Sequence, residues 1–206
     1  MNELTHSSIF MQASDYVPVQ NVTDYGTSRF KDDESYHTNM AAFKRLANWI
    51  SYLKENGVYD NTRIIFVADH SRATTEDCIE ENLELDMSIA GDRYRGRGHF
   101  HPLLMMKNFG ASGGLKKDMT FMTNGDVPSL ALRGVIENPV NPFTTKAVPL
   151  DTSEIKKDGV VVSASDVHQA WLYKNLYTYP VRKDQWWRVK GSIFKASSWS
   201  RESVED

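Results

Sequence analysis

A short apolar run that ends in two adjacent polar side chains constrains this chain more than any other feature. Residues 63–72 read Arg-Ile-Ile-Phe-Val-Ala-Asp-His-Ser-Arg, so a β-branched and aromatic run stops at Asp69 and His70. This run, entered from a turn-like sequence at residues 59–62, predicts a buried strand of a parallel sheet. Ligands of open α/β sheets bind at the carboxyl ends of strands. The pair is therefore either a ligand pair or an ordinary loop sequence.

The elements around this strand predict a mixed α/β chain. Apolar residues recur at spacings of three and four in residues 35–57, which predicts an amphipathic helix ending at Asn-Gly. A second strand is predicted at residues 102–106. A second helix is predicted to run from Asp126, as its N-cap, to the prolines that begin at Pro139. Because a helix followed by a strand is half of a parallel crossover unit, we expect an α/β fold.

The character of the sequence changes near residue 150. Short apolar stretches replace the long ones, and two of them, at 186–189 and 192–194, flank Lys-Gly. This pattern predicts a hairpin in a small antiparallel unit. We therefore expect an α/β part at residues 1–150 and a small antiparallel subdomain at residues 151–206.

Composition limits the classes of protein to which the chain can belong. With 206 residues, 40% of them hydrophobic, and a net charge of -3, it is neither a disordered chain nor a generally basic nucleic-acid binder. The single cysteine, Cys78, cannot form an internal disulfide. No signal peptide and no apolar window of bilayer length is present in the sequence, so we expect this chain to be soluble and not inserted in a membrane.

Several histidines lie where they could join the Asp-His pair. Four of the six, His6, His70, His99 and His101, fall in loops or at predicted strand ends. In an extended segment His99 and His101 point to the same side. Carboxylate and imidazole are the usual oxygen and nitrogen ligands of zinc and manganese. The pattern alone equally allows a second interpretation, in which Asp69 caps the turn and the histidines are solvated.

Four segments occur along the chain in an informative order. They are Leu4-Thr5-His6, the Asp-His pair after its strand, the sequence His-Phe-His-Pro-Leu-Leu at residues 99–104, and Thr-Asn-Gly-Asp-Val-Pro at residues 123–128. Together they resemble the C-terminal half of the alkaline-phosphatase superfamily. More narrowly, their order is similar to the sulfatase-like group of lipoteichoic acid synthases, phosphoglycerol transferases and phosphoethanolamine transferases. The resemblance covers roughly residues 1 to 145.

This resemblance implies a fold and a set of metal ligands. The fold would be part of a sulfatase-like sandwich, with a mostly parallel sheet between helix layers and metal at the carboxyl ends of strands. Asp69 and His70 match the adjacent metal-ligand pair, for manganese or zinc, with calcium or magnesium as further options. His6 matches the histidine that contacts the head group or the transition-state oxygens, and His99 or His101 matches a further pocket histidine. One departure is Ser71, because glycine usually follows the pair.

The resemblance also implies an anionic lipid or glycan head group of the cell envelope as substrate. Arg95 and Arg97 could clamp such a group, since guanidinium pairs bidentately with phosphate, although two arginines among glycines also suit a solvated loop. Phosphoryl or sulfuryl transfer needs a nucleophile, which the family places in an N-terminal half expected to precede Met1. We therefore expect a fragment of a parent protein at the extracytoplasmic face of a bacterial membrane.

Two other classes of protein remain open at this point. One is a stand-alone binding module that keeps a degenerate sulfatase-like fold without the reaction. The other is a complete metallohydrolase whose ligands all lie in this chain, namely His6, Asp69, His70, His99 and His101. The first predicts little effect of Asp69→Ala on binding, and the second predicts stoichiometric metal and phosphodiesterase activity in the 206 residues.

Overall fold

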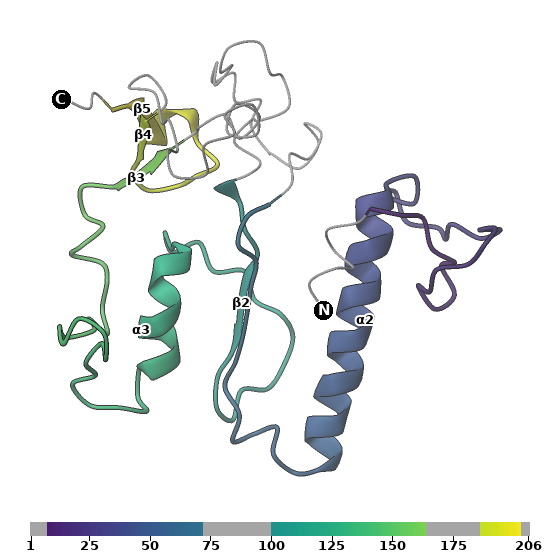
Figure 1. Ribbon diagram of the computed structural model, residues 1–206, viewed down its shortest axis with the longest axis horizontal. Coiled ribbons are helices and arrows are strands. Elements are labelled where there is room, and N and C mark those ends of the chain that lie inside the picture. The colour runs from purple at the N-terminus through teal and green to yellow at the C-terminus, as the bar shows by residue number, and fades with distance from the viewer. Residues whose placement is uncertain (1–7, 72–99, 164–185, 203–206) are drawn as a thin grey trace. The chain divides into compact units, whose positions relative to one another are not determined.

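The computed structural model describes residues 8–71, 100–163 and 186–202. In these residues two α-helices, two 3-10 turns and five short strands follow one another (Figure 1). The chain forms two compact units, Met1–Arg63 with Asn108–Ser112, and Ile64–Lys107 with Gly113–Asp206. The predicted mixed α/β class is confirmed, and the predicted boundary near residue 150 stays a prediction.

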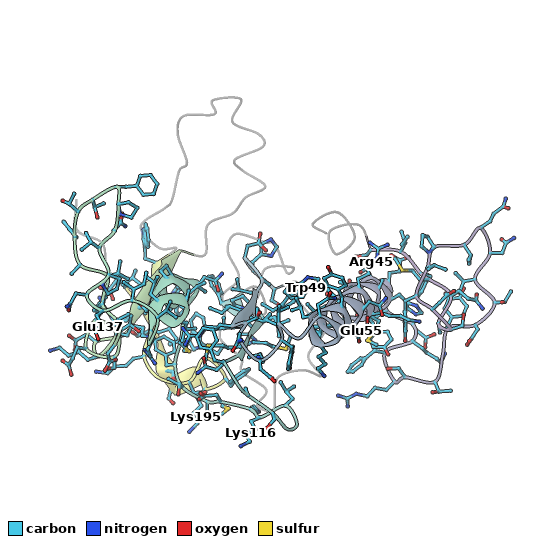
Figure 2. The ribbon with its side chains drawn as sticks, turned by 90° about the horizontal axis from the view of Figure 1, so that it is seen from below. Arg45, Trp49, Glu55, Lys116, Glu137 and Lys195 are labelled. Atoms are coloured by element: carbon cyan, nitrogen blue, oxygen red, sulfur yellow. The ribbon has the colours of Figure 1, made fainter. Side chains whose placement is uncertain are left out.

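Helix α2 (Glu34–Glu55) is the longest element of the first unit, and it matches the predicted helix closely. It begins at Asp33, whose carboxylate accepts a hydrogen bond from the backbone N–H of Ser35 at 2.7 Å. It ends at Asn56, and Gly57 follows with φ of 69°, the left-handed conformation that favours glycine. Arg45, Trp49 and Glu55 mark exposed positions along it (Figure 2).

An aromatic cluster packs around the first turns of α2. The imidazole of His37 is fully buried and lies 5.5 to 6.1 Å, between ring centroids, from the rings of Phe10, Tyr16, Tyr25 and Tyr36. Its Nε2 bonds to the backbone carbonyl of residue 31 at 2.7 Å. Because edge-to-face ring pairs add to the burial of apolar surface, this cluster anchors the loop of residues 8–33 to the helix.

The second unit contains a two-stranded ribbon, β1 (Ile64–Val67) and β2 (Leu104–Lys107). The strands pair antiparallel, with Ile64 opposite Lys107 and Val67 opposite Leu104, which corrects the parallel pairing predicted for this strand. In the part of the chain that the structure describes both sheets are antiparallel, so the mostly parallel sandwich is not confirmed. An apolar run fits either kind of sheet, and the pairing direction depends on a connection that the run does not encode.

The predicted second helix begins where expected and ends earlier. The turn η3 (Asn124–Asp126) leads into α3 (Val127–Leu132), with Pro128 in the first turn. Gly134 then adopts φ of 71° and the helix stops, whereas the apolar pattern extended to Ile136. Val135 and Ile136 are about half exposed, so burial in the described part of the chain gives little stabilisation to a further turn.

A three-stranded antiparallel sheet forms the C-terminal part of the second unit, which confirms the antiparallel character predicted for this region. Strand β4 (Trp186–Val189) pairs with β3 (Val160–Ser163) and with β5 (Trp199–Arg201). The predicted hairpin partner at residues 192–194 is wrong, because that segment belongs to the β4–β5 connection, where the indole of Trp199 donates to Ile193 O at 3.0 Å. Trp187, Val189 and Trp199 form the buried core of this sheet.

Within the described ranges, no helix combines the length and the apolar character that crossing a bilayer requires.

Candidate metal-ligand site

The Asp-His pair follows the last hydrogen bond of the β1–β2 ribbon. The backbone N–H of Ala68 donates to Leu103 O at 2.9 Å, one residue beyond β1. Asp69 and His70 come next, with side chains that are 89% and 65% exposed. The ladder therefore fixes the chain up to the residue before the pair, and both side chains reach solvent where a ligand can approach them.

Hydrogen bonds to the backbone determine how the two side chains are presented. His70 Nδ1 lies 3.0 Å from Ser71 O. Because a carbonyl only accepts, Nδ1–H is the donor of this hydrogen bond, and a neutral ring with this donor has its lone pair on Nε2. The backbone N–H of His70 donates to Asp69 Oδ1 at 2.9 Å, which orients the carboxylate. Histidines that bind metal usually donate their other ring N–H to a carbonyl or carboxylate in this way.

The separation of the two donor atoms fits a shared cation closely. Asp69 Oδ2 and His70 Nε2 are 3.8 Å apart. Two ligands at roughly 2.1 Å from a tetrahedral metal lie about 3.4 Å from each other. A small rotation of either exposed side chain closes this difference, so an oxygen and a nitrogen donor here could hold one divalent cation.

A side chain from a distant part of the sequence holds the backbone of this turn. The amide nitrogen of Asn124 donates to Ala68 O at 2.9 Å and to Asp69 O at 3.0 Å. Asn124 opens η3, so the start of this turn lies against the end of β1. The segment at residues 123–128 and the Asp-His pair, which the sequence analysis relates only by their order, are therefore in contact.

His101 is the other predicted site residue in the described part of the chain, and its ring contacts an aromatic side chain. His101 is half-buried and its ring packs on Phe194, with 5.0 Å between centroids. Among the described residues, no group of three or more His, Cys, Asp or Glu side chains is placed to hold a metal. The remaining predicted residues, His6, Arg95, Arg97 and His99, lie outside the described residues.

No family model, curated protein or solved structure matches this chain.

A buried ion pair lies two residues after Asn124. Asp126 is 2% exposed, and its Oδ2 accepts from Lys156 Nζ at 2.7 Å and from Thr123 N at 2.6 Å. Burial by itself raises the pKa of the Asp126 carboxyl, but hydrogen bonds from Lys156, Thr152 and Thr123 outweigh it and hold this pKa below the usual 3.8. The buried Asp126–Lys156 pair therefore stabilises the turn that carries Asn124.

Sequence reasoning did not assign a role to Asn124. Its segment was part of the resemblance, yet an asparagine before a helix has an ordinary explanation as a turn residue. The signal that identifies it is the pair of hydrogen bonds across 55 residues of sequence, and only a structure supplies it.

Proposed function

We propose that this chain is the C-terminal portion of a sulfatase-like enzyme that transfers or hydrolyses a phosphoryl or sulfuryl group, and that it supplies half of the metal site. The observation that carries the proposal is the geometry of Asp69 and His70. A carboxylate and an imidazole whose Nδ1 faces the Ser71 carbonyl project together from the end of a strand, with Asp69 Oδ2 and His70 Nε2 3.8 Å apart. The order of the surrounding segments supports it.

The proposed fold is a larger, mostly parallel sheet between helices, to which the β1–β2 ribbon contributes. A two-stranded ribbon by itself is at best marginally stable in water. Ile64, Ile65 and Phe66 of β1 are half-buried in the described structure. Further strands beside the ribbon would cover these side chains more fully, which is consistent with the proposed sandwich.

The cation that suits this donor set is manganese or zinc. Imidazole is a good ligand for zinc, and carboxylate oxygen suits both ions, whereas calcium and magnesium prefer ligand sets made of oxygen alone. When bound, such a cation neutralises charge on the oxygens of the transferred group. Asp69 and His70 would hold the cation, and the Ser71 carbonyl, as acceptor of the Nδ1 hydrogen bond, would leave Nε2 of the neutral His70 ring as the ligand atom.

Among the residues with the remaining roles, His101 is described, and His6, Arg95, Arg97 and His99 lie outside the described part of the chain. In the proposal His6 donates a hydrogen bond or a proton near the leaving group. Arg95 and Arg97 bind the anionic head group of a lipid or glycan, and His99 or His101 lines its pocket. The nucleophile comes from the N-terminal half of the parent protein, which acts at the extracytoplasmic face of a bacterial membrane.

The experiment that tests this function uses the native protein. An antibody against these 206 residues captures it from membrane and soluble fractions of the source cells, and its mass, metal content and activity are measured. We expect a membrane-fraction protein much heavier than 23.5 kDa that contains manganese or zinc. We also expect it to transfer or release the head group of a fluorescent phosphatidylglycerol or phosphatidylethanolamine.

A soluble protein of 23.5 kDa without metal or activity would contradict the proposal and favour the stand-alone binding module. A soluble protein of that mass with stoichiometric metal and phosphodiesterase activity would instead favour the complete metallohydrolase.

A further inference from the structure

We propose that Asn124 is a positioning residue for the Asp69–His70 pair, and this inference rests on the proposed function of that pair. Asn124 contacts neither side chain in the structure. Its amide instead holds the two backbone carbonyls that lead into the pair, Ala68 O and Asp69 O. Asn124 therefore restrains the backbone from which the side chains of Asp69 and His70 project.

The orientation of the amide follows from its partners. Both partners are carbonyl oxygens, which only accept, so the NH2 group and not the oxygen of Asn124 faces the turn. The two N–H bonds of one nitrogen go to two successive carbonyls, at 2.9 and 3.0 Å. A single-donor side chain could hold one of these carbonyls but not both.

The turn that carries Asn124 is itself held by hydrogen bonds and a buried ion pair. Thr123 N donates to Asp126 Oδ2, and the same oxygen accepts from Lys156 Nζ. Lys156 Nζ also donates to Phe121 O at 3.0 Å. Asn124 thus links this turn to the exposed end of β1. Because the turn is held by hydrogen bonds, the amide of Asn124 restrains the backbone carbonyls of Ala68 and Asp69.

The physical consequence concerns the conformations that the pair samples before it binds a cation. Asp69 and His70 are mostly exposed, so little packing restrains them. Loss of the amide frees the two carbonyls and adds conformations in which the donor atoms diverge. Removing the groups that orient metal ligands typically weakens metal affinity by about 10-fold to 100-fold, and we expect the lower end here because Asn124 acts through the backbone.

Three variants of the full chain separate positioning from a general loss of stability. Asn124→Ala removes both hydrogen bonds, and Asn124→Gln keeps an amide that can reach the same carbonyls at an exposed position. The matched control is Asn141→Ala. Asn141 also orders a turn in the same unit, where its Oδ1 accepts from Phe143 N at 2.9 Å and Thr144 N at 3.2 Å, but it serves its own loop.

Nitrogen-15 NMR of the His70 ring gives one readout with metal and one without. In the metal-free chain the ring nitrogens report the tautomer, and we expect wild type and Asn141→Ala to show Nδ1–H alone. We expect Asn124→Ala to show a mixture of tautomers. With Mn²⁺ added, we expect Asn124→Ala to need about 10-fold more metal for equal broadening of the His70 signal, and Asn124→Gln to recover part of this loss.

The two readouts distinguish failure of the inference from failure of the proposed function. An unchanged tautomer and an unchanged Mn²⁺ requirement in Asn124→Ala would overturn the positioning role while wild-type broadening upheld the metal site. Wild-type His70 that is not broadened by millimolar Mn²⁺ would contradict the proposed function, and the metal-free tautomer would still decide the role of Asn124.

Discussion

At the scale of single residues, the structure contains two charged pairs with different roles. Asp69 and His70 are exposed and could bind a ligand, and Asp126 and Lys156 are buried and stabilise the fold. Asp69 and His70 reach solvent, whereas Asp126 and Lys156 have side chains that are only 3% and 11% exposed. A buried carboxylate without a partner is costly because water no longer solvates it. The two pairs therefore respond differently to substitution.

Lys156→Met should destabilise the chain strongly, because it leaves the Asp126 carboxylate buried without its cation. We expect a loss of about 3 to 5 kcal/mol in the free energy of unfolding, measured by urea denaturation. The control is Lys157→Met, which removes an exposed ion pair to Glu154 at 3.4 Å and should cost less than about 1 kcal/mol. Equal losses in the two variants would refute the structural role of the buried pair.

The same pair predicts the acid side of the stability profile. The folded-state pKa of Asp126 lies below its ordinary 3.8, so the ionised carboxylate stabilises the fold above that pH. The contribution disappears as the pH falls below 3.8 and through the folded-state pKa. In Lys156→Met burial raises the pKa of Asp126, so we expect acid unfolding, followed by circular dichroism, to begin at a higher pH than in wild type.

At the scale of elements, the sequence predicted the helices and strands whose bounds are set by residues of the same segment. The apolar spacing and the Asn56-Gly57 ending predicted α2 from its own segment, and the structure adds Asp33 as its N-cap. The β1–β2 pairing direction and the length of α3 were not predictable, because they depend on contacts outside each segment. The apolar pattern around Ile136 suits a helix, but about half of that side chain is exposed. Its burial therefore does not stabilise another helical turn.

The N-cap of α2 is a direct test of that local account. Asp33→Ala removes the acceptor of the Ser35 N–H and should lower the stability of the first unit by about 0.5 to 2 kcal/mol. Asp32→Ala is the matched control, since among the described residues Asp32 makes an exposed ion pair with Lys31 at 2.8 Å and caps no helix. Thermal denaturation followed at 222 nm compares them, and equal melting temperatures would contradict the assignment of the cap.

The C-terminal sheet offers a test of packing rather than of local signals. Trp187 is 5% exposed in the core of the sheet, whereas Val161 of β3 is 39% exposed. Trp187→Ala should cost about 3 to 5 kcal/mol through lost burial and the cavity left behind, while Val161→Ala should cost much less. Tryptophan fluorescence during denaturation measures both, and a small effect of Trp187→Ala would mean that this core does not stabilise the sheet.

At the scale of the whole molecule, the features predicted from the sequence are divided between two compact units. The first contains the predicted helix α2, and the second contains strand β1 and the Asp-His pair. The exposed Asp-His pair was predictable because two polar residues ended an apolar run. The contact of Asn124 with the backbone of Asp69 was not predictable, since nothing in the sequence indicates an approach across a separation of 55 positions. The proposed function requires one property of the Asp69–His70 pair, the ability to bind a divalent cation.

The most direct test is a titration of the 206-residue chain with Mn²⁺, in which electron paramagnetic resonance measures the free ion. We expect Asp69→Asn, which removes the charge and keeps the shape, to weaken binding by on the order of 10-fold or more. The matched control Asp118→Asn alters an exposed aspartate that likewise accepts from its own loop, from Thr120 N at 2.9 Å, and should bind like wild type. Equal Mn²⁺ binding by wild type, Asp69→Asn and Asp118→Asn would contradict the proposed metal site.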